Sequence, residues 1–199
     1  MIAAVVLAAG TSSRLGRPKQ LLDLGGKPVL RHVVDAALAA PLDEVVVVLG
    51  HDAERIAPVL PDDPRVRTTV NARFAEGQST SLAAGLDALP GGCRAAVILL
   101  GDQPGIRPEA IEAVIGGFAE GLGPVVQASY DGGPGHPTLL AWAVWPQVVA
   151  ELGGDEGARA VLGRHPDWVQ AIAVAGSAPL DIDTEDDYLR IRVQFNARD

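Results

Sequence analysis

The sequence is short of cysteine, because its 199 residues include only one, Cys93. A single cysteine excludes a disulfide within the chain and any cysteine-rich metal site, and we expect it to be buried at the start of a strand. No apolar run approaches the roughly 18 residues that cross a membrane. The apolar N-terminus has no basic segment before it, as a signal peptide would have. These absences favour a cytoplasmic protein without a membrane partner.

Positive charge is scarce as well. The chain has 16 Lys and Arg residues against 25 Asp and Glu, a formal net charge of −9. This excess of negative charge argues against a nucleic-acid partner. Only two of the cations are lysines, Lys19 and Lys27, and five cations but one acid lie between residues 14 and 31. A basic cluster at one place in an acidic chain indicates a small anionic ligand held there.

Apolar residues, by contrast, are plentiful at 48% of the chain, and they form runs that alternate with helical patterns. The runs at 44–50 and 94–100 have almost no polar alternation, which is typical of strands buried on both faces of a parallel sheet. Strands are expected at 2–9, 44–50, 65–70, 94–100, 125–130, 138–142 and near 168–174. Helices are expected at 28–38, 52–59, 79–89, 108–119, 143–151, 156–164 and from near 184.

This alternation of strands and helices predicts the fold class. A βαβ series folds into an α/β protein, here a three-layer α/β/α sandwich with a mostly parallel, Rossmann-like central sheet. The sequence shows no internal repeat and no linker long enough to mark a boundary. Residues 1–199 are therefore expected to form a single domain.

The loop after the first apolar run reads LAAGTSSRLGRPKQLL, from Leu7 to Leu22. A glycine-rich turn between a strand and a helix can present backbone N–H groups to phosphate. The spacing fits neither the phosphate loop G-x-x-x-x-G-K-[ST] nor the dinucleotide fingerprint G-x-G-x-x-G. The small residues still leave room for a ligand against the backbone, and Arg14 and Lys19 can neutralise phosphate oxygens. The loop therefore predicts a phosphate site of a third kind.

The same loop resembles the signature of the MobA-like nucleotidyltransferases of the GT-A-like fold, and most of all their cytidylyl-transferring branch, which acts on molybdenum cofactor. Further segments resemble the family in its own order, so that the resemblance covers nearly the whole chain. These are N-x(5)-G-x-x-x-S-L at 71–82, L-G-D-Q-P at 100–104, G-H-P at 135–137, G-D-E-G-A-R at 154–159 and D-I-D-T-E-D at 181–186. The first motif is highly specific, and the others reinforce one another by order and spacing.

The resemblance implies a reaction and a set of site residues. A phosphate oxygen of the acceptor attacks the α-phosphorus of a nucleoside triphosphate, and pyrophosphate leaves; the protein aligns two polyanions and neutralises the charge that develops. The catalytic residues would be Arg14, Lys19 and Asp102, and Asp102 and Asp183 would hold Mg²⁺ or Mn²⁺. The nucleotide would be bound by Leu7, Ala8, Ala9, Gly10, Thr11, Ser13, Arg14, Lys19, Asn71, Gln78, Ser79, Ser81 and Asp102. The acceptor would be bound by His136, Pro137, Gly154 and Asp155. Residues 1–105 would then be a nucleotide-binding half and residues 106–199 an acceptor-binding half.

The acidic residues of this set have alternatives that the sequence leaves open. Asp102 could be a plain turn residue, because GDQPG is a composition that makes turns. Asp181 could be the second metal carboxylate in place of Asp183, since alternation along a strand would put both on one face. Asp183 or Thr184 could simply cap the last helix.

The polar contacts have plainer explanations too. One of Ser79 and Ser81 could only cap the helix expected at 79–89. His136 lies in DGGPGHP, where a lone histidine is more often exposed and idle than catalytic. Contact between His136 and substrate stays open.

The choice of base and acceptor is a finer prediction. The loop has Ala9 where the guanylyl-transferring relatives usually have glycine, and the added methyl would favour CTP by about 1–3 kcal/mol. The implied acceptor is molybdenum-bound molybdopterin, and a molybdenum hydroxylase could receive the product. The alternatives are a transferase that uses GTP or another phosphorylated acceptor, a nicotinamide-dependent reductase, and a non-catalytic escort of the cofactor.

Overall fold

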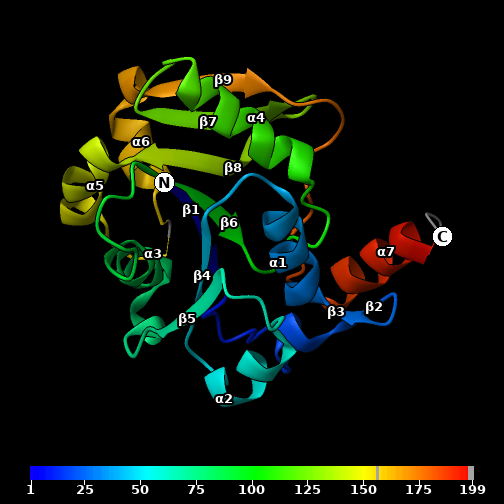
Figure 1. Cartoon of the computed structure of the whole chain (residues 1–199). Helices are drawn as coiled ribbons and strands as arrows, with labels where there is room; N and C mark the ends of the chain where they lie inside the picture. The colour runs from blue at the N-terminus through cyan, green and yellow to red at the C-terminus, as the bar shows by residue number, and fades with distance from the viewer. Residues whose placement is uncertain (156, 197–199) are drawn as a thin grey trace.

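A computed structural model describes residues 1–155 and 157–196 of the chain. Its centre is a seven-stranded sheet with the order β5-β4-β1-β6-β8-β7-β9 (Figure 1). The strands are β1 (Ile2–Leu7), β4 (Glu44–Leu49), β5 (Val66–Val70), β6 (Ala95–Leu100), β7 (Val125–Tyr130), β8 (Gly133–Ala141) and β9 (Val169–Ala173). Only β8 runs antiparallel to its neighbours, β6 and β7, so the sheet is mostly parallel as expected.

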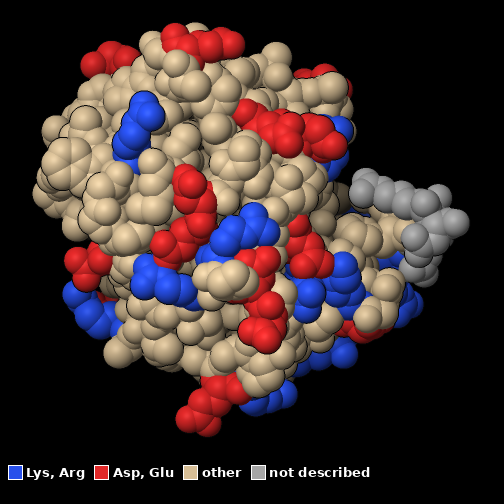
Figure 2. Space-filling model, in the orientation of Figure 1, with Lys and Arg blue, Asp and Glu red and all other residues tan. Residues whose placement is uncertain are grey.

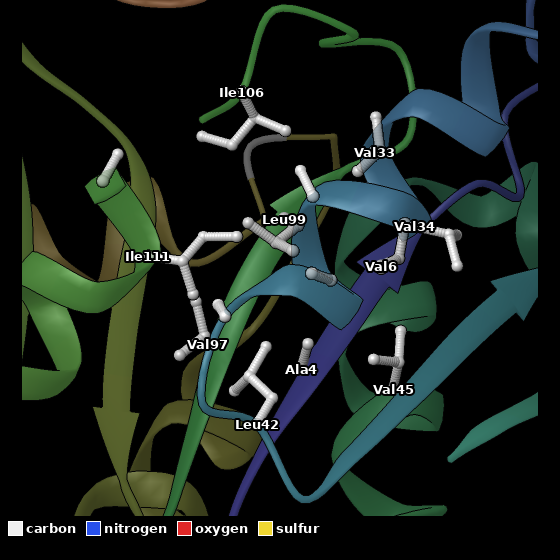
Figure 3. Close-up of a cluster of buried hydrophobic side chains, with 14 of the residues drawn as sticks. Ala4, Val6, Val33, Val34, Leu42, Val45, Val97, Leu99, Ile106 and Ile111 are labelled. Atoms are coloured by element: carbon white, nitrogen blue, oxygen red, sulfur yellow. The ribbon is translucent and has the colours of Figure 1, made fainter. Parts of the chain in front are cut away.

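Helices cover both faces of the sheet (Figure 1). On one face lie α1 (Val29–Ala39), α2 (Ala53–Ile56) and α4 (Pro108–Ala119), and on the other lie α3 (Gln78–Asp87), α5 (Trp145–Glu151) and α6 (Arg159–Arg164). Successive side chains of β1 point to opposite faces, so that Ala4 and Val6 join the first core while Ala3 and Val5 join the second. Figure 3 shows the first of these cores. The predicted three-layer sandwich is confirmed.

The last helix, α7 (Glu185–Asn196), packs away from the sheet, beside the small hairpin of β2 (Asp23–Leu24) and β3 (Lys27–Pro28) (Figure 1). A third buried cluster joins them, made of Leu22, Leu24, Val29, Ile182, Tyr188 and Ile191. The N-terminus of α7 is capped by Thr184, whose hydroxyl accepts from the backbone N–H of Asp187 at 3.2 Å while the Asp187 carboxylate accepts from Thr184 N at 2.9 Å. Thr184 is therefore the cap, and Asp183 is not needed for it.

Several expected boundaries differ from those of the structure, and those of β8, α6 and α3 are among them. Strand β8 begins at Gly133 and not at 138, because Gly133 and Pro134 pair with the end of β7 and a register shift in β7 absorbs the irregularity. Helix α6 starts at Arg159, whereas the sequence predicted a start at 156. Residue 156 itself lies outside the described residues. The helix expected at 79 begins at Gln78, with Gly77 as its N-cap and no side-chain cap, so neither Ser79 nor Ser81 caps it. No helix among the described residues is long and apolar enough to cross a membrane.

Candidate active site

The opening loop is fixed in place by a buried side chain. Gln20, which is 2% exposed, donates from Nε2 to the carbonyl oxygen of Ala8 at 2.9 Å and to that of Gly10 at 3.4 Å. The hydroxyl of Ser12 accepts from the backbone N–H of Lys19 at 3.1 Å. These bonds tie both ends of the loop together, because β1 ends just before Ala8 and Lys19 begins the short 3₁₀ turn of residues 19–21. Gln20 was not among the predicted site residues, and no pattern in the sequence marked it.

Lys19 joins three distant segments of the chain. Its ammonium contacts the carboxylate of Asp102, just after β6, and lies 3.0 Å from Oδ1 of Asp183, just before α7. Arg14 adds a second cation, with Nη2 2.9 Å from Oδ2 of Asp183. The Lys19 side chain is 15% exposed and that of Asp102 is 18% exposed, so water screens this contact only partly. The three residues predicted as catalytic therefore gather around one point.

The electrostatics of this cluster agree with its geometry. Burial by itself lowers the pKa of Lys19, but attraction and hydrogen bonding to Asp102 and Asp183 outweigh burial and leave the pKa raised. Burial tends to raise the pKa of Asp183, yet the contacts with Lys19 and Arg14 leave it lowered. Lys19 is therefore held as a cation and Asp183 as an anion at neutral pH.

The segment 181–183 has the alternation that the sequence predicted, without being a strand. Ile182 is fully buried in the third cluster, and its backbone N–H donates to the carbonyl oxygen of Asp102 at 3.1 Å. Asp181 accepts from Nε2 of Gln103 at 2.8 Å. Burial and the negative charge of Asp102 raise the pKa of Asp181. Both aspartates reach the same cavity, but only Asp183 contacts Lys19.

These residues line a cavity of about 600 Å³ at the carboxyl ends of β1 and β6. In open α/β sheets, ligands bind at this end of the strands. Of the predicted residues, the cavity is lined by Leu7, Ala8, Ala9, Gly10, Thr11, Arg14, Lys19, Gln78, Ser81, Asp102, Asp155 and Asp183. The lining also includes residues that were not predicted as site residues, among them Gln20, Phe74, Gly77 and Gly101. Phe74 and Gly77 lie inside the motif at 71–82, which could have indicated them.

Acidic and basic side chains mix across the cavity. Its lining has two cations, Arg14 and Lys19, against four acids, Asp102, Asp155, Asp181 and Asp183. Figure 2 shows that acidic and basic side chains are also interspersed over the face of the molecule that it views, with no large patch of one sign. A polyanionic ligand would therefore meet a surplus of carboxylates, which a bound divalent cation would offset.

Asn71 organises the start of α3 without reaching the cavity. It is 5% exposed and donates from Nδ2 to the hydroxyls of Thr80 at 2.8 Å and Ser81 at 3.0 Å. Its Oδ1 accepts from the backbone N–H of Arg73 at 2.9 Å. Ser79 is buried behind the wall, and its backbone N–H donates to the Gly154 carbonyl oxygen at 3.3 Å. Asn71 and Ser79 thus support the wall that Ser81 and Gln78 form.

Of the residues predicted to bind the acceptor, only some line the cavity. Asp155 lines the cavity, whereas Gly154 packs against Gly77 behind it. His136 is partly buried, with Nδ1 3.3 Å from the carbonyl oxygen of Ile98, and burial lowers its pKa. Pro137 is buried in β8. The alternative that His136 is an exposed residue of a loop is therefore wrong. Neither His136 nor Pro137 lines the cavity.

A divalent cation fits the residues present. The carboxylates of Asp102 and Asp183 converge on a single positive atom, Nζ of Lys19. Mg²⁺ and Mn²⁺ prefer such oxygen ligands, and Mg²⁺ is usually held by one or two carboxylates together with substrate phosphates. Among the described residues, no group of three or more His, Cys, Asp or Glu side chains could hold a metal by itself. The protein would thus supply part of the shell, and phosphate oxygens the rest.

The fold and its structural neighbours make this chain a nucleotidyltransferase of the GT-A-like fold, and the cluster of Lys, Arg and Asp beside a small-residue loop agrees with that class. The chain belongs to the family described as "MobA-like NTP transferase domain", whose model matches residues 4–169.

Similar proteins agree with this family. The solved structure of a nucleotidyl transferase from Methanothermobacter has a TM-score of 0.82 at 30% identity, covering 100% of this chain and 99% of that one. Rv0371c of Mycobacterium tuberculosis H37Rv, solved as a complex with manganese, has a TM-score of 0.80 at 32% identity, covering 96% of this chain and 98% of that one. The nicotine blue oxidoreductase of Paenarthrobacter nicotinovorans is 30% identical over 197 residues, which cover 96% of each chain.

Proposed function

We propose that this nucleotidyltransferase moves CMP from CTP to a phosphate of molybdenum-bound molybdopterin and releases pyrophosphate, with Mg²⁺ or Mn²⁺ as cofactor. The observation that carries the proposal is the convergence of Arg14, Lys19, Asp102 and Asp183 at one cavity. Family membership supports the reaction type, and the resemblance of the opening loop to the cytidylyl-transferring branch supports the donor and the acceptor.

The proposed reaction needs no covalent enzyme intermediate. An oxygen of the acceptor phosphate forms a bond to the α-phosphorus, and the bond from that phosphorus to the bridging oxygen of the β-phosphate breaks. Arg14 and Lys19 neutralise phosphate oxygens and the negative charge on departing pyrophosphate. Thr11 offers a hydroxyl at the rim of the loop. Alignment of two polyanions supplies the rest of the acceleration.

Asp102 and Asp183 would hold the divalent cation. When bound, the ion would neutralise phosphate charge and offset the repulsion between the triphosphate and the carboxylates. Lys19 contacts both carboxylates, so we propose that it moves onto the phosphates when substrate enters. The manganese complex of Rv0371c supports a divalent cation in this family.

The preference for CTP rests mainly on the resemblance of the loop. Ala9 lines the cavity but is only 4% exposed, and a Cβ placed at Gly50 would come within 2.8 Å of its methyl. The methyl therefore packs toward Gly50, and it narrows the cavity less than the sequence alone suggested. Replacement of Ala9 with Gly is expected to relax the discrimination between CTP and GTP by at most tenfold, or about 1.4 kcal/mol.

The acceptor is proposed to lie against the half formed by residues 106–199. Asp155 contributes to the cavity wall from this half. His136, Pro137 and Gly154 do not line the cavity, so they would affect the acceptor only by supporting the residues that do. A molybdenum hydroxylase as recipient of the product, and the cytoplasmic location, remain predictions from the sequence.

One relative favours a second candidate function. The nicotine blue oxidoreductase is similar over nearly the whole chain, so a nicotinamide-dependent reduction in this same cavity is the competing proposal. The absence of a G-x-G-x-x-G fingerprint in the opening loop argues against it.

A single panel separates the two functions. Purified protein is incubated with molybdenum-loaded molybdopterin and CTP, GTP or ATP, with Mg²⁺, with Mn²⁺ or with EDTA, and pyrophosphate is measured. Thermal shift is recorded with each triphosphate and with NADPH. The expected result is pyrophosphate release with CTP that EDTA abolishes and either metal restores. Stabilisation by NADPH alone, together with no pyrophosphate from any triphosphate, would refute the transferase.

A further inference from the structure

Gln103 is a buried side chain that the reaction proposed above does not use. It follows Asp102 directly and is 6% exposed. Its Nε2 donates to Oδ1 of Asp181 at 2.8 Å, across 78 positions of the chain. Because a carboxylate accepts and does not donate, this contact fixes which end of the amide faces Asp181.

The hydrogen bond from Gln103 lies beside a second one between the same two segments. The backbone N–H of Ile182 donates to the carbonyl oxygen of Asp102 at 3.1 Å. The two bonds connect the turn that carries Asp102 with the segment that carries Asp183. The buried side chain of Ile182 anchors that segment from its other side. The connection therefore joins the two segments that hold the carboxylates of Asp102 and Asp183.

The cost of the arrangement points to a role in the site. Oε1 of Gln103 is buried and has no hydrogen-bond partner among the described residues. A buried acceptor without a partner is unfavourable, and native proteins keep few of them. An apolar side chain would fill the same space without that cost, but it could not hold Asp181. Among the described residues, no lysine, arginine or histidine lies within 4.0 Å of the Asp181 carboxylate, and the side chain that hydrogen-bonds to it is that of Gln103.

We propose that Gln103 is a positioning residue: through its hydrogen bond to Asp181 it sets the separation between Asp102 and Asp183 and so the affinity of the site for a divalent cation. The inference rests on the proposed function, because it concerns the same site. Gln103 and Asp181 act from behind the carboxylates that bind the ion. Such supporting partners typically contribute 10- to 100-fold in metal affinity.

The test measures Mn²⁺ binding directly, by electron paramagnetic resonance and calorimetry, with CTP present to supply the phosphate oxygens and with no acceptor, so that no transfer takes place. Gln103→Leu is expected to weaken Mn²⁺ binding about 10- to 100-fold, because it removes the donor while it fills the space. Gln103→Glu places two carboxylates against each other and is expected to weaken binding at least as much. Combining Gln103→Glu with Asp181→Asn exchanges donor and acceptor at unchanged total charge and is expected to recover most of the affinity.

A matched control separates positioning from a general loss of stability. Gln127 in β7 also donates a partly buried amide hydrogen bond, to the Thr138 hydroxyl at 3.3 Å, and Gln127→Leu removes it far from Asp181 in the chain. Gln127→Leu is expected to leave Mn²⁺ affinity unchanged. Thermal melting identifies any variant that fails to fold, and the exchanged pair keeps the test decisive if Gln103→Leu does so.

The outcomes distinguish this proposal from the function on which it rests. Wild-type affinity in a folded Gln103→Leu variant, or no recovery in the exchanged pair, overturns the positioning role. A wild-type protein that binds no Mn²⁺ when CTP is present overturns both the metal site and Gln103 as its support. Mn²⁺ binding that responds as expected, without any CMP transfer, upholds the role of Gln103 and refutes only the proposed reaction.

Discussion

Nζ of Lys19 lies 3.0 Å from Oδ1 of Asp183, although 164 positions of sequence separate them. The same ammonium contacts Asp102, so that one cation joins the loop after β1, the turn after β6 and the segment before α7. Three segments that are far apart in the sequence thereby form one charged site.

The first prediction concerns this lysine. Lys19→Met removes the buried cation while it keeps an unbranched side chain of similar length, and we expect a loss of pyrophosphate release of about 10²–10³-fold. Lys19→Arg is not expected to restore activity, because the planar guanidinium differs in shape and hydrogen-bonding geometry from a compact ammonium.

The other lysine of the chain supplies the control for that experiment. Lys27 pairs with Asp35, with Nζ and Oδ2 2.6 Å apart, and does not line the cavity. Lys27→Met removes the same charge and is expected to leave pyrophosphate release unchanged. Full activity in Lys19→Met, or an equal loss in both variants, contradicts the assignment of Lys19.

The second prediction concerns Gly77, which precedes α3. Its φ is +116°, and a Cβ there would come within 2.4 Å of the Gly154 carbonyl oxygen. Gly77→Ala is therefore expected to destabilise the protein by about 1–3 kcal/mol and to weaken triphosphate binding, since Gly77 also lines the cavity. Chemical denaturation and calorimetry measure the two effects.

Gly116 in α4 is the matched control for Gly77. A Cβ at Gly116 would meet no atom within 4 Å, and the residue is helical. Gly116→Ala is expected to stabilise the protein by about 0.5–1 kcal/mol, because alanine loses less backbone entropy in a helix. Equal stability of the two variants would show that the left-handed backbone of Gly77 is not required.

The third prediction concerns Ile182, which anchors the segment between Asp181 and Asp183. Ile182→Ala leaves a cavity in a fully buried place and is expected to lower the free energy of unfolding by about 2–5 kcal/mol, whereas Ile182→Val should cost about 0.5–1.5 kcal/mol. Urea denaturation measures both. Activity should fall more in the alanine variant, because the carboxylates lose their support; an intact rate there would mean that the backbone alone holds them.

The fourth prediction is a pH dependence away from the site. Hydrogen bonds from Gln147, His165 and Arg164 lower the pKa of Glu151 from 4.5 to about 2. A lowered pKa means that the contribution of Glu151 to stability is complete above 4.5 and is lost as the pH falls toward 2. The difference in Tm between wild type and Glu151→Gln should therefore be present at neutral pH and close in strong acid.

A second acid serves as the control for this titration. Glu120, at the end of α4, forms no ion pair among the described residues. Glu120→Gln is measured over the same pH range as the reference for the loss of an acid without an ion pair. A Glu151→Gln difference that persisted in strong acid would show that the ionised carboxylate is not what stabilises this corner.

Much of the fold follows from local physics that the sequence displays. Unbroken apolar runs such as those of β4 and β6 can only be buried on both faces, so the layered α/β architecture was predictable. The antiparallel strand β8 begins earlier in the structure than the sequence predicted. Its first residues are rich in glycine and proline, a composition that predicts a loop, but they pair with β7.

By itself, the sequence indicated the residues of the proposed site, because the loop with Arg14 and Lys19, the turn with Asp102 and the segment with Asp183 each carry a local pattern. The tertiary structure alone decided how they meet. It chose Thr184 over Asp183 as the helix cap, placed Ser79 behind the cavity wall and brought Gln20 and Gln103 under the site. The reason is physical, since a buried amide acts through partners distant in the chain, and only folding brings those partners within hydrogen-bond distance.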